Sequence, residues 1–250
     1  MTFINSEKPL LTAMIQCHTA DECCKKIKNS LKEGADAFGI QLCQLYLEER
    51  SEEHLNKIFS ACEGKPIYIT SYHSRESEYL SEEECVELLL RGLKCGATLC
   101  DVRGDQYDVC ECQLSKDPIA IKKQKDLVDK IHKFGGEVLM STHDFRTLSS
   151  EYVVSVAKEQ INRGADIIKV VINNENPDSL IEALKTINEL KKLGKPFLFL
   201  DIGACAKIVR RLGPTLGVCM YLCVDEHGIL DTPVQPLIRE VKYIRDNIDF

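Results

Sequence analysis

The feature that most constrains this chain is a repeated alternation of short apolar runs with longer amphipathic stretches. Most of the apolar runs are continuous, which is typical of strands buried on both faces. The eight runs are Leu10–Gln16, Ala37–Cys43, Pro66–Tyr72, Thr98–Val102, Glu137–Ser141, Ile167–Ile172, Pro196–Ile202 and Cys219–Val224. The stretches with helical periodicity are Ala20–Glu33, Glu52–Cys62, Ser81–Lys94, Ala120–Phe134, Ser149–Arg163, Asp178–Leu193, Cys205–Leu212 and Pro236–Asn247.

This strict alternation predicts a fold of the α/β class. Eight strands, each followed by a helix, indicate a parallel sheet closed into a (β/α)₈ barrel, the TIM barrel. A doubly wound open sheet is the alternative, but no GxGxxG turn follows the first strand, and eight strands favour closure. We find no linker or low-complexity segment, so we expect residues 1–250 to form one barrel domain.

Composition excludes several classes of function. The formal net charge is −7, and no block of Lys and Arg occurs, so we expect neither a nucleic-acid partner nor an acidic membrane partner. The first ten residues lack the pattern of a secretory leader, and no apolar run approaches the roughly 20 residues that span a bilayer. We therefore expect a cytoplasmic protein.

Thirteen cysteines are many for a chain of this length. Their number is odd, and Cys43, Cys100, Cys219 and Cys223 lie within apolar runs, where a free thiol packs as a small hydrophobic group. No CxxC pair occurs, and the Cys110–Cys112 spacing is poor for zinc. We interpret the cysteines as reduced and structural, and we expect no metal site.

In such barrels the chemistry sits at the carboxyl ends of the strands and in the loops that follow. The candidates at these positions are Gln16, Cys17, His18, Gln41, Cys43, Tyr72, His73, Glu76, Asp101, Arg103, Asp105, His143, Asp144, Lys169, Asp201 and Asp225.

Lys169 is the most informative of these residues, because it interrupts the apolar run Ile167–Ile172. Burying an ammonium is costly, so a lysine inside a strand is rare. Burial shifts a lysine pKa downward, and a neutral amine can attack a ketone or aldehyde to form a Schiff base. The alternative is an outward-facing Lys169 that pairs with a carboxylate on a helix.

His143 lies at the end of the preceding strand, at the predicted mouth of the barrel. Histidine transfers protons near neutral pH, and adjacent strands would bring His143 and Lys169 together. Glu76, just after the third strand, is placed to orient the imidazole. A histidine that is only a satisfied polar group, and a glutamate that is only a solvated loop acid, remain the alternatives.

The residues around this pair resemble type I 3-dehydroquinate dehydratase. The resemblance rests on Ser141–Phe145 (STHDF) and Asp166–Val170 (DIIKV), and it extends from Pro9 to the last helix. Pro66–Thr70 resembles the third strand of the family, which places Glu76 at the glutamate that partners the catalytic histidine. The resemblance implies a metal-independent hydro-lyase without an organic cofactor, in the shikimate pathway of aromatic amino-acid biosynthesis, and a homodimer.

The resemblance also implies substrate-binding residues. Ile208–Arg210 resembles the segment whose arginine binds the substrate carboxylate, with Arg210 or the adjacent Arg211 in that role. Thr232–Gln235 resembles the lid after the eighth strand, whose glutamine, here Gln235, contacts substrate. In the family, the lysine forms an imine with a cyclic hydroxy-keto acid, and the histidine moves the α-proton and assists the loss of water.

Several positions depart from the family pattern. A Glu-x-Arg-x-Asp motif that binds ring hydroxyls is replaced by Gly39–Cys43, with Gln41 at the arginine position. Tyr72 stands where an arginine is expected, and Asp231 or Thr232 where a lid serine is expected. Charged hydrogen bonds contribute roughly 1.5–3 kcal/mol each, so we expect either a related cyclic hydroxy-keto acid as substrate or a weakened activity on the usual one.

Two other functions remain open. A class I aldolase shares the barrel and the lysine, but would release two carbonyl fragments instead of water. A non-catalytic, dehydratase-like protein that binds a metabolite would keep the pocket without turnover.

Overall fold

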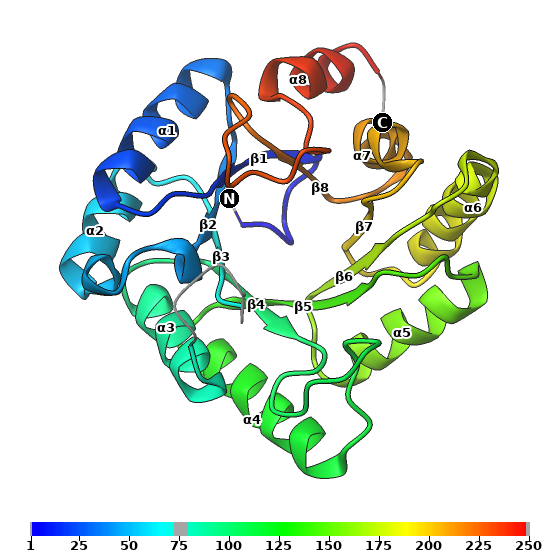
Figure 1. The fold of residues 1–250 in the computed structure, drawn as a ribbon, viewed down its shortest axis with the longest axis horizontal. Coiled ribbons are helices and arrows are strands. Elements are labelled where there is room, and N and C mark those ends of the chain that lie inside the picture. The colour runs from blue at the N-terminus through cyan, green and yellow to red at the C-terminus, as the bar shows by residue number, and fades with distance from the viewer. Residues whose placement is uncertain (1, 73–79, 249–250) are drawn as a thin grey trace.

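The computed structural model describes residues 2–72 and 80–248 of the chain, and within them eight strands alternate with eight α-helices (Figure 1). The strands are β1 (Leu10–Ile15), β2 (Ala37–Gln41), β3 (Ile67–Thr70), β4 (Leu99–Arg103), β5 (Glu137–Asp144), β6 (Ile167–Ile172), β7 (Phe197–Asp201) and β8 (Met220–Cys223). The helices are α1 (Ala20–Glu33), α2 (Glu52–Ser60), α3 (Glu82–Lys94), α4 (Pro118–Lys133), α5 (Ser150–Asn162), α6 (Leu180–Lys191), α7 (Ala206–Leu212) and α8 (Ile238–Asp246).

The strands form one parallel sheet in the order β7-β6-β5-β4-β3-β2-β1-β8. Its two end strands meet where the Cys219 N–H donates to the Phe197 carbonyl at 2.9 Å. The helices surround the sheet on its outside (Figure 1). The predicted (β/α)₈ barrel is therefore confirmed.

The helices begin and end at residues that the sequence marks. Thr19 and Ser81 each close a capping box, with Glu22 and Glu84 respectively, which satisfies backbone N–H groups at the starts of α1 and α3. Gly34 ends α1 with a φ of 96°, a left-handed conformation that glycine adopts without a Cβ penalty. These local signals fix where each helix turns back toward the next strand.

Two boundaries differ from the sequence prediction. Strand β5 extends past Ser141 to Asp144 because His143 and Asp144 pair with Val171 and Ile172 of β6. His143 thus lies within a strand. Strand β2 ends at Gln41, and Cys43 lies in a short 3₁₀ helix, Leu42–Gln44, because the chain turns there and the Cys43 carbonyl accepts from the buried Arg50 guanidinium.

No helix among the described residues is both long and apolar enough to cross a bilayer.

Candidate active site

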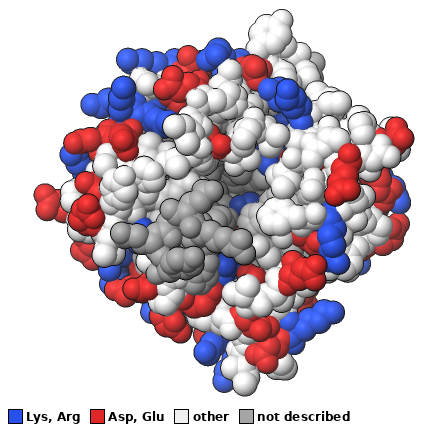
Figure 2. Space-filling view, in the orientation of Figure 1, with Lys and Arg blue, Asp and Glu red and all other residues white. Residues whose placement is uncertain are grey.

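A cavity of about 290 Å³ occupies the carboxyl-terminal mouth of the barrel. Side chains in a strand alternate between two faces, so residues two apart share one face. Tyr68, Thr70 and Tyr72 of the β3 segment all line this cavity, and so do Lys169 and Val171 of β6. Figure 2 shows a hollow near the centre of the molecule, with basic atoms in its depth.

Lys169 points into the barrel, not toward the helices, and only 5% of its surface is exposed. Its Nζ lies 2.9 Å from the Tyr72 hydroxyl, 3.1 Å from the Tyr68 hydroxyl and 3.1 Å from Asp101 Oδ2. Gln160 fixes the backbone behind it, since its side-chain amide bonds both the N–H and the carbonyl of Lys169. The outward-facing alternative is therefore wrong.

Asp101, on β4, is the counter-ion of this amine. Burial alone acts to raise the pKa of this carboxyl. Lys169 and the hydroxyls of Ser141, Tyr68 and Tyr72 outweigh burial and hold the pKa of Asp101 below its usual range. The same burial, together with Asp101, raises the pKa of both tyrosines well above their usual range, so they remain donors.

His143 lines the same cavity as Lys169. In the β5–β6 ladder Ser141 pairs with Lys169, so His143 lies two residues nearer the mouth. The imidazole meets the Tyr72 ring edge-on, with centroids 5.6 Å apart, and its Nδ1 lies 2.8 Å from Gln113 Oε1. Burial, and then the Lys169 charge, lower the pKa of His143 to about 3, so the imidazole is neutral at physiological pH.

Arg210, on α7, is the second cation of the cavity wall. Its Nε donates to the Asp201 carbonyl at 2.8 Å, and burial lowers its pKa to about 10, which still leaves it charged at neutral pH. Arg211 turns away and bonds Glu240 at 2.6 Å on the outside of the barrel. Of the two arginines, the structure brings Arg210 to the cavity.

The loop after β8 covers one side of the mouth. Gln235 and Thr232 line the cavity, and Gln235 Oε1 accepts from the Thr232 N–H at 3.2 Å. Asp231 does not line it, because its carboxylate accepts from Lys26 Nζ at 2.9 Å and from the Gly228 N–H at 2.7 Å. Of Asp231 and Thr232, Thr232 is thus the one that lines the cavity.

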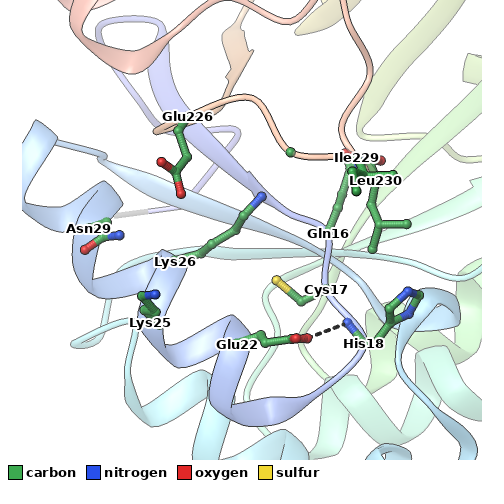
Figure 3. Close-up of a pocket in the computed structure, with 11 residues that line it drawn as sticks. Gln16, Cys17, His18, Glu22, Lys25, Lys26, Asn29, Glu226, Ile229 and Leu230 are labelled. Carbon is green, nitrogen blue, oxygen red and sulfur yellow. Dashed lines mark hydrogen bonds between the residues drawn. The ribbon is translucent and has the colours of Figure 1, made fainter.

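A second cavity, of about 390 Å³, lies outside the first, between α1 and the same loop. Figure 3 shows its lining residues, with Lys26 reaching from α1 toward the loop and Gln16 beside Leu230. Gln16 lines both cavities and donates through Nε2 to the Leu230 carbonyl at 2.5 Å. Two side chains, Gln16 and Lys26, therefore hold this loop against the barrel.

The mouth cavity also carries the substitutions that the sequence indicated. Gln41 and Tyr72 line it as neutral side chains. A Cβ built on Gly39 would lie 2.3 Å from the Met14 Sδ, so the Met14 thioether fills the space that a larger side chain would need. The cavity wall therefore has no charged side chain at the Gly39 and Gln41 positions of β2.

Glu76 lies outside the described residues. Tyr68 and Gln113 were not among the sequence candidates, and Asp101 was a candidate without an assigned role; all three lie within hydrogen-bonding distance of Lys169 or His143. Tyr68 could have been found from the sequence, because the period-two spacing Tyr68-x-Thr70-x-Tyr72 places it on the same strand face as Tyr72. Gln113 lies in the loop between β4 and α4 and carries no such signal.

All thirteen cysteines are free thiols, and eight of them are buried. Within residues 2–72 and 80–248, no group of three or more His, Cys, Asp or Glu side chains is arranged to hold a metal ion.

Comparison with known proteins gives one consistent family. Residues 11–248 match the family model described as type I 3-dehydroquinase. A 3-dehydroquinate dehydratase of Methanosarcina acetivorans is 27% identical over 226 residues, which cover 88% of each chain.

Solved structures show the same fold. The 3-dehydroquinate dehydratase of Geobacillus kaustophilus superposes with a TM-score of 0.83 at 18% identity, over 97% of this chain and 92% of that one. A type I enzyme of Clostridium difficile, solved with covalent modified comenic acid, gives 0.82 at 18% identity, over 97% and 93%.

Proposed function

The chain belongs to the type I 3-dehydroquinase family, and from this premise we propose that it is a Schiff-base hydro-lyase acting on 3-dehydroquinate or a related cyclic hydroxy-keto acid. The observation that carries the proposal is the buried Lys169 amine, which shares one cavity with the neutral His143 imidazole and the Arg210 guanidinium. These three groups supply a nucleophile, a base and a carboxylate-binding cation.

The first step is attack of the Lys169 amine on the ketone carbon. The ammonium first gives up its proton, either to the contacting Asp101 carboxylate or to water. The carbinolamine oxygen takes back that proton and leaves as water, and a protonated imine joins Nζ to the substrate. The positive nitrogen withdraws electrons from the neighbouring carbon and acidifies its C–H bond.

His143 then acts as base and acid in turn. Its neutral form can accept the α-proton, which leaves an enamine. The enamine electrons expel the β-hydroxyl, which takes the proton from His143 and departs as water. Hydrolysis of the conjugated imine releases the enone and restores Lys169. The net change is loss of one water from the hydroxy-ketone.

We assign Arg210 to the substrate carboxylate. We assign Gln235, on the loop after β8, to contact with the bound substrate. Arg210 Nε donates to the Asp201 carbonyl, and within residues 2–72 and 80–248 the other two guanidinium nitrogens have no hydrogen-bond partner. Two such nitrogens can bind a carboxylate in a fixed geometry. The neutral Gln41 and Tyr72 of the cavity wall support a substrate whose ring hydroxyls need no charged partner.

Borohydride trapping tests the proposal. A panel of cyclic hydroxy-keto acids that includes 3-dehydroquinate is incubated with the protein and reduced, and the adduct is located by mass spectrometry. We expect one adduct on Lys169 and none in Lys169→Ala. In His143→Gln we expect the adduct without release of enone. Absence of any Lys169 adduct across the panel contradicts the proposal.

The products separate the two other functions. Two carbonyl fragments in place of the enone and water would identify an aldolase. Ligand-induced thermal stabilisation that persists in Lys169→Ala, with no turnover in the parent, would identify a binding protein.

A further inference from the structure

Gln113 contacts His143 at two points, the imidazole ring and the backbone N–H. Its Oε1 lies 2.8 Å from the ring Nδ1 and 3.1 Å from the backbone nitrogen of the same histidine. One atom therefore contacts both the ring and the main chain of a residue that lines the mouth cavity. Neither contact depends on the 73–79 segment.

The backbone contact determines the orientation of the amide. A backbone N–H can only donate, so the side-chain atom of Gln113 that meets it must be the carbonyl oxygen. That oxygen has no proton to give to the ring. The ring nitrogen facing it must therefore carry the proton, which leaves Nε2 as the nitrogen with the lone pair.

The loop around Gln113 is built to hold this contact. Gln113 itself has a φ of 46°, an unusual conformation for a residue with a side chain. Its carbonyl accepts from the Thr142 hydroxyl at 3.2 Å, and its N–H donates to the Cys110 carbonyl at 3.0 Å. The backbone on either side is held by the buried Arg163, which donates to the Gly104 and Ser115 carbonyls.

From this geometry we propose that Gln113 is a positioning residue that keeps His143 in the Nδ1–H tautomer, with Nε2 as the base. The role deepens the proposed function, on which its catalytic meaning rests. A neutral amide fixes the tautomer without adding a negative charge beside the ring. A carboxylate at the same place would fix the tautomer as well, but would also favour the imidazolium.

Nitrogen-15 NMR of the histidine ring reads the tautomer directly and needs no substrate. The His143 signals are assigned by their loss in His143→Gln. At neutral pH we expect the Nδ1–H form in the parent protein. In Gln113→Leu, which matches the volume but has no acceptor, we expect the Nε2–H form or a mixture. In Gln113→Glu we expect the Nδ1–H form to persist while the pKa of His143 rises.

The second readout is the turnover, without borohydride, of a substrate that the trapping experiment has identified. We expect Gln113→Leu to lower kcat roughly tenfold to a hundredfold with borohydride trapping at Lys169 retained, since acid–base catalysis as a whole contributes roughly 10²–10⁴-fold. We expect Gln113→Glu to keep more activity than Gln113→Leu and to shift the acidic limb of the pH profile upward.

The two proposals fail separately. An Nε2–H tautomer in the parent, or an unchanged tautomer in a folded Gln113→Leu, overturns the role of Gln113 whether or not the protein is a dehydratase. Absence of a Lys169 adduct overturns the dehydratase proposal and leaves the tautomer assignment standing. If Gln113→Leu does not fold, the parent tautomer and the Gln113→Glu titration still decide.

Discussion

Lys169 and Asp101 form a buried ion pair at the base of the mouth cavity, with Nζ 3.1 Å from Oδ2. Their side chains are 6% and 0% exposed, so neither charge is well hydrated. Such a pair contributes little net stability relative to apolar residues, but it is costly to break, because the remaining charge is left buried without its partner. The pair holds the Lys169 amine in a fixed place in the cavity wall.

Replacing Asp101 with Asn should therefore destabilise the protein by about 3–5 kcal/mol, measured as the free energy of unfolding in urea. The double variant Asp101→Asn/Lys169→Met should recover much of that loss, because it removes the unpaired ammonium. A loss below about 1 kcal/mol in the single variant, or no recovery in the double variant, would contradict a tightly coupled pair.

The charge of Lys169 also acts on His143. Burial is the first cause of the lowered pKa of His143, and the Lys169 ammonium is the second. In the parent protein the ring signals should stay those of neutral imidazole from pH 8 down to about 5. Lys169→Met should raise the pKa of His143 toward its ordinary value, measured by NMR titration. An unchanged titration in a folded Lys169→Met would show that the two groups are not electrostatically coupled.

The lowered pKa of His143 also predicts how the free energy of unfolding changes with pH. The folded protein binds the His143 proton less readily than the unfolded chain does, so the contribution of His143 to stability is fully present above about pH 6.5. It falls as the pH drops from there toward 3. His143→Gln should flatten this part of the profile of unfolding free energy. A profile as steep in His143→Gln as in the parent would assign the slope to other groups.

Arg210 and Arg211 provide a matched pair of substitutions on one helix. Arg210 lines the cavity, whereas Arg211 bonds Glu240 outside it. Arg210→Met should raise the Kd for a carboxylate-bearing keto acid by roughly 10- to 150-fold, which corresponds to a charged hydrogen bond of about 1.5–3 kcal/mol. Arg211→Met should change it less than about twofold. Equal effects of the two substitutions would remove Arg210 from the substrate site.

The barrel could be predicted from the sequence because its signals are local and repeated. Most of the buried strands are continuous apolar runs, and capping residues such as Thr19 and Gly34 mark the helix ends. Lys169 and His143 could be paired because consecutive strands are neighbours in a parallel barrel. Alternation within strands then carries both side chains to the interior.

The partners of these two residues could not be found in the same way. Asp101 was one of many polar residues near strand ends, and only the ring of contacts from Tyr68, Tyr72 and Lys169 distinguishes it. Gln113 reaches His143 through an irregular loop whose path depends on Arg163, a residue fifty positions later in the chain. Asp231 has the right sequence position for the lid, but the Lys26 ammonium draws its carboxylate away from the cavity.

The ion pair between Lys26 and Asp231 joins the loop after β8 to helix α1, and its removal should loosen this loop. The Asp231 side chain is fully buried, and the Lys26 side chain is 17% exposed. Lys26→Met would leave the Asp231 carboxylate buried without its cation. Opening of the loop would hydrate that carboxylate, so the free-energy cost of opening falls. Amide hydrogen exchange across residues 228–235 should then become at least about tenfold faster, equivalent to about 1.4 kcal/mol of lost local stability. Lys25 precedes Lys26 on α1 and also lines the outer cavity, and Lys25→Met should leave this exchange unchanged. Similar acceleration in both variants would mean that general charge on α1, not the bond to Asp231, holds the loop closed.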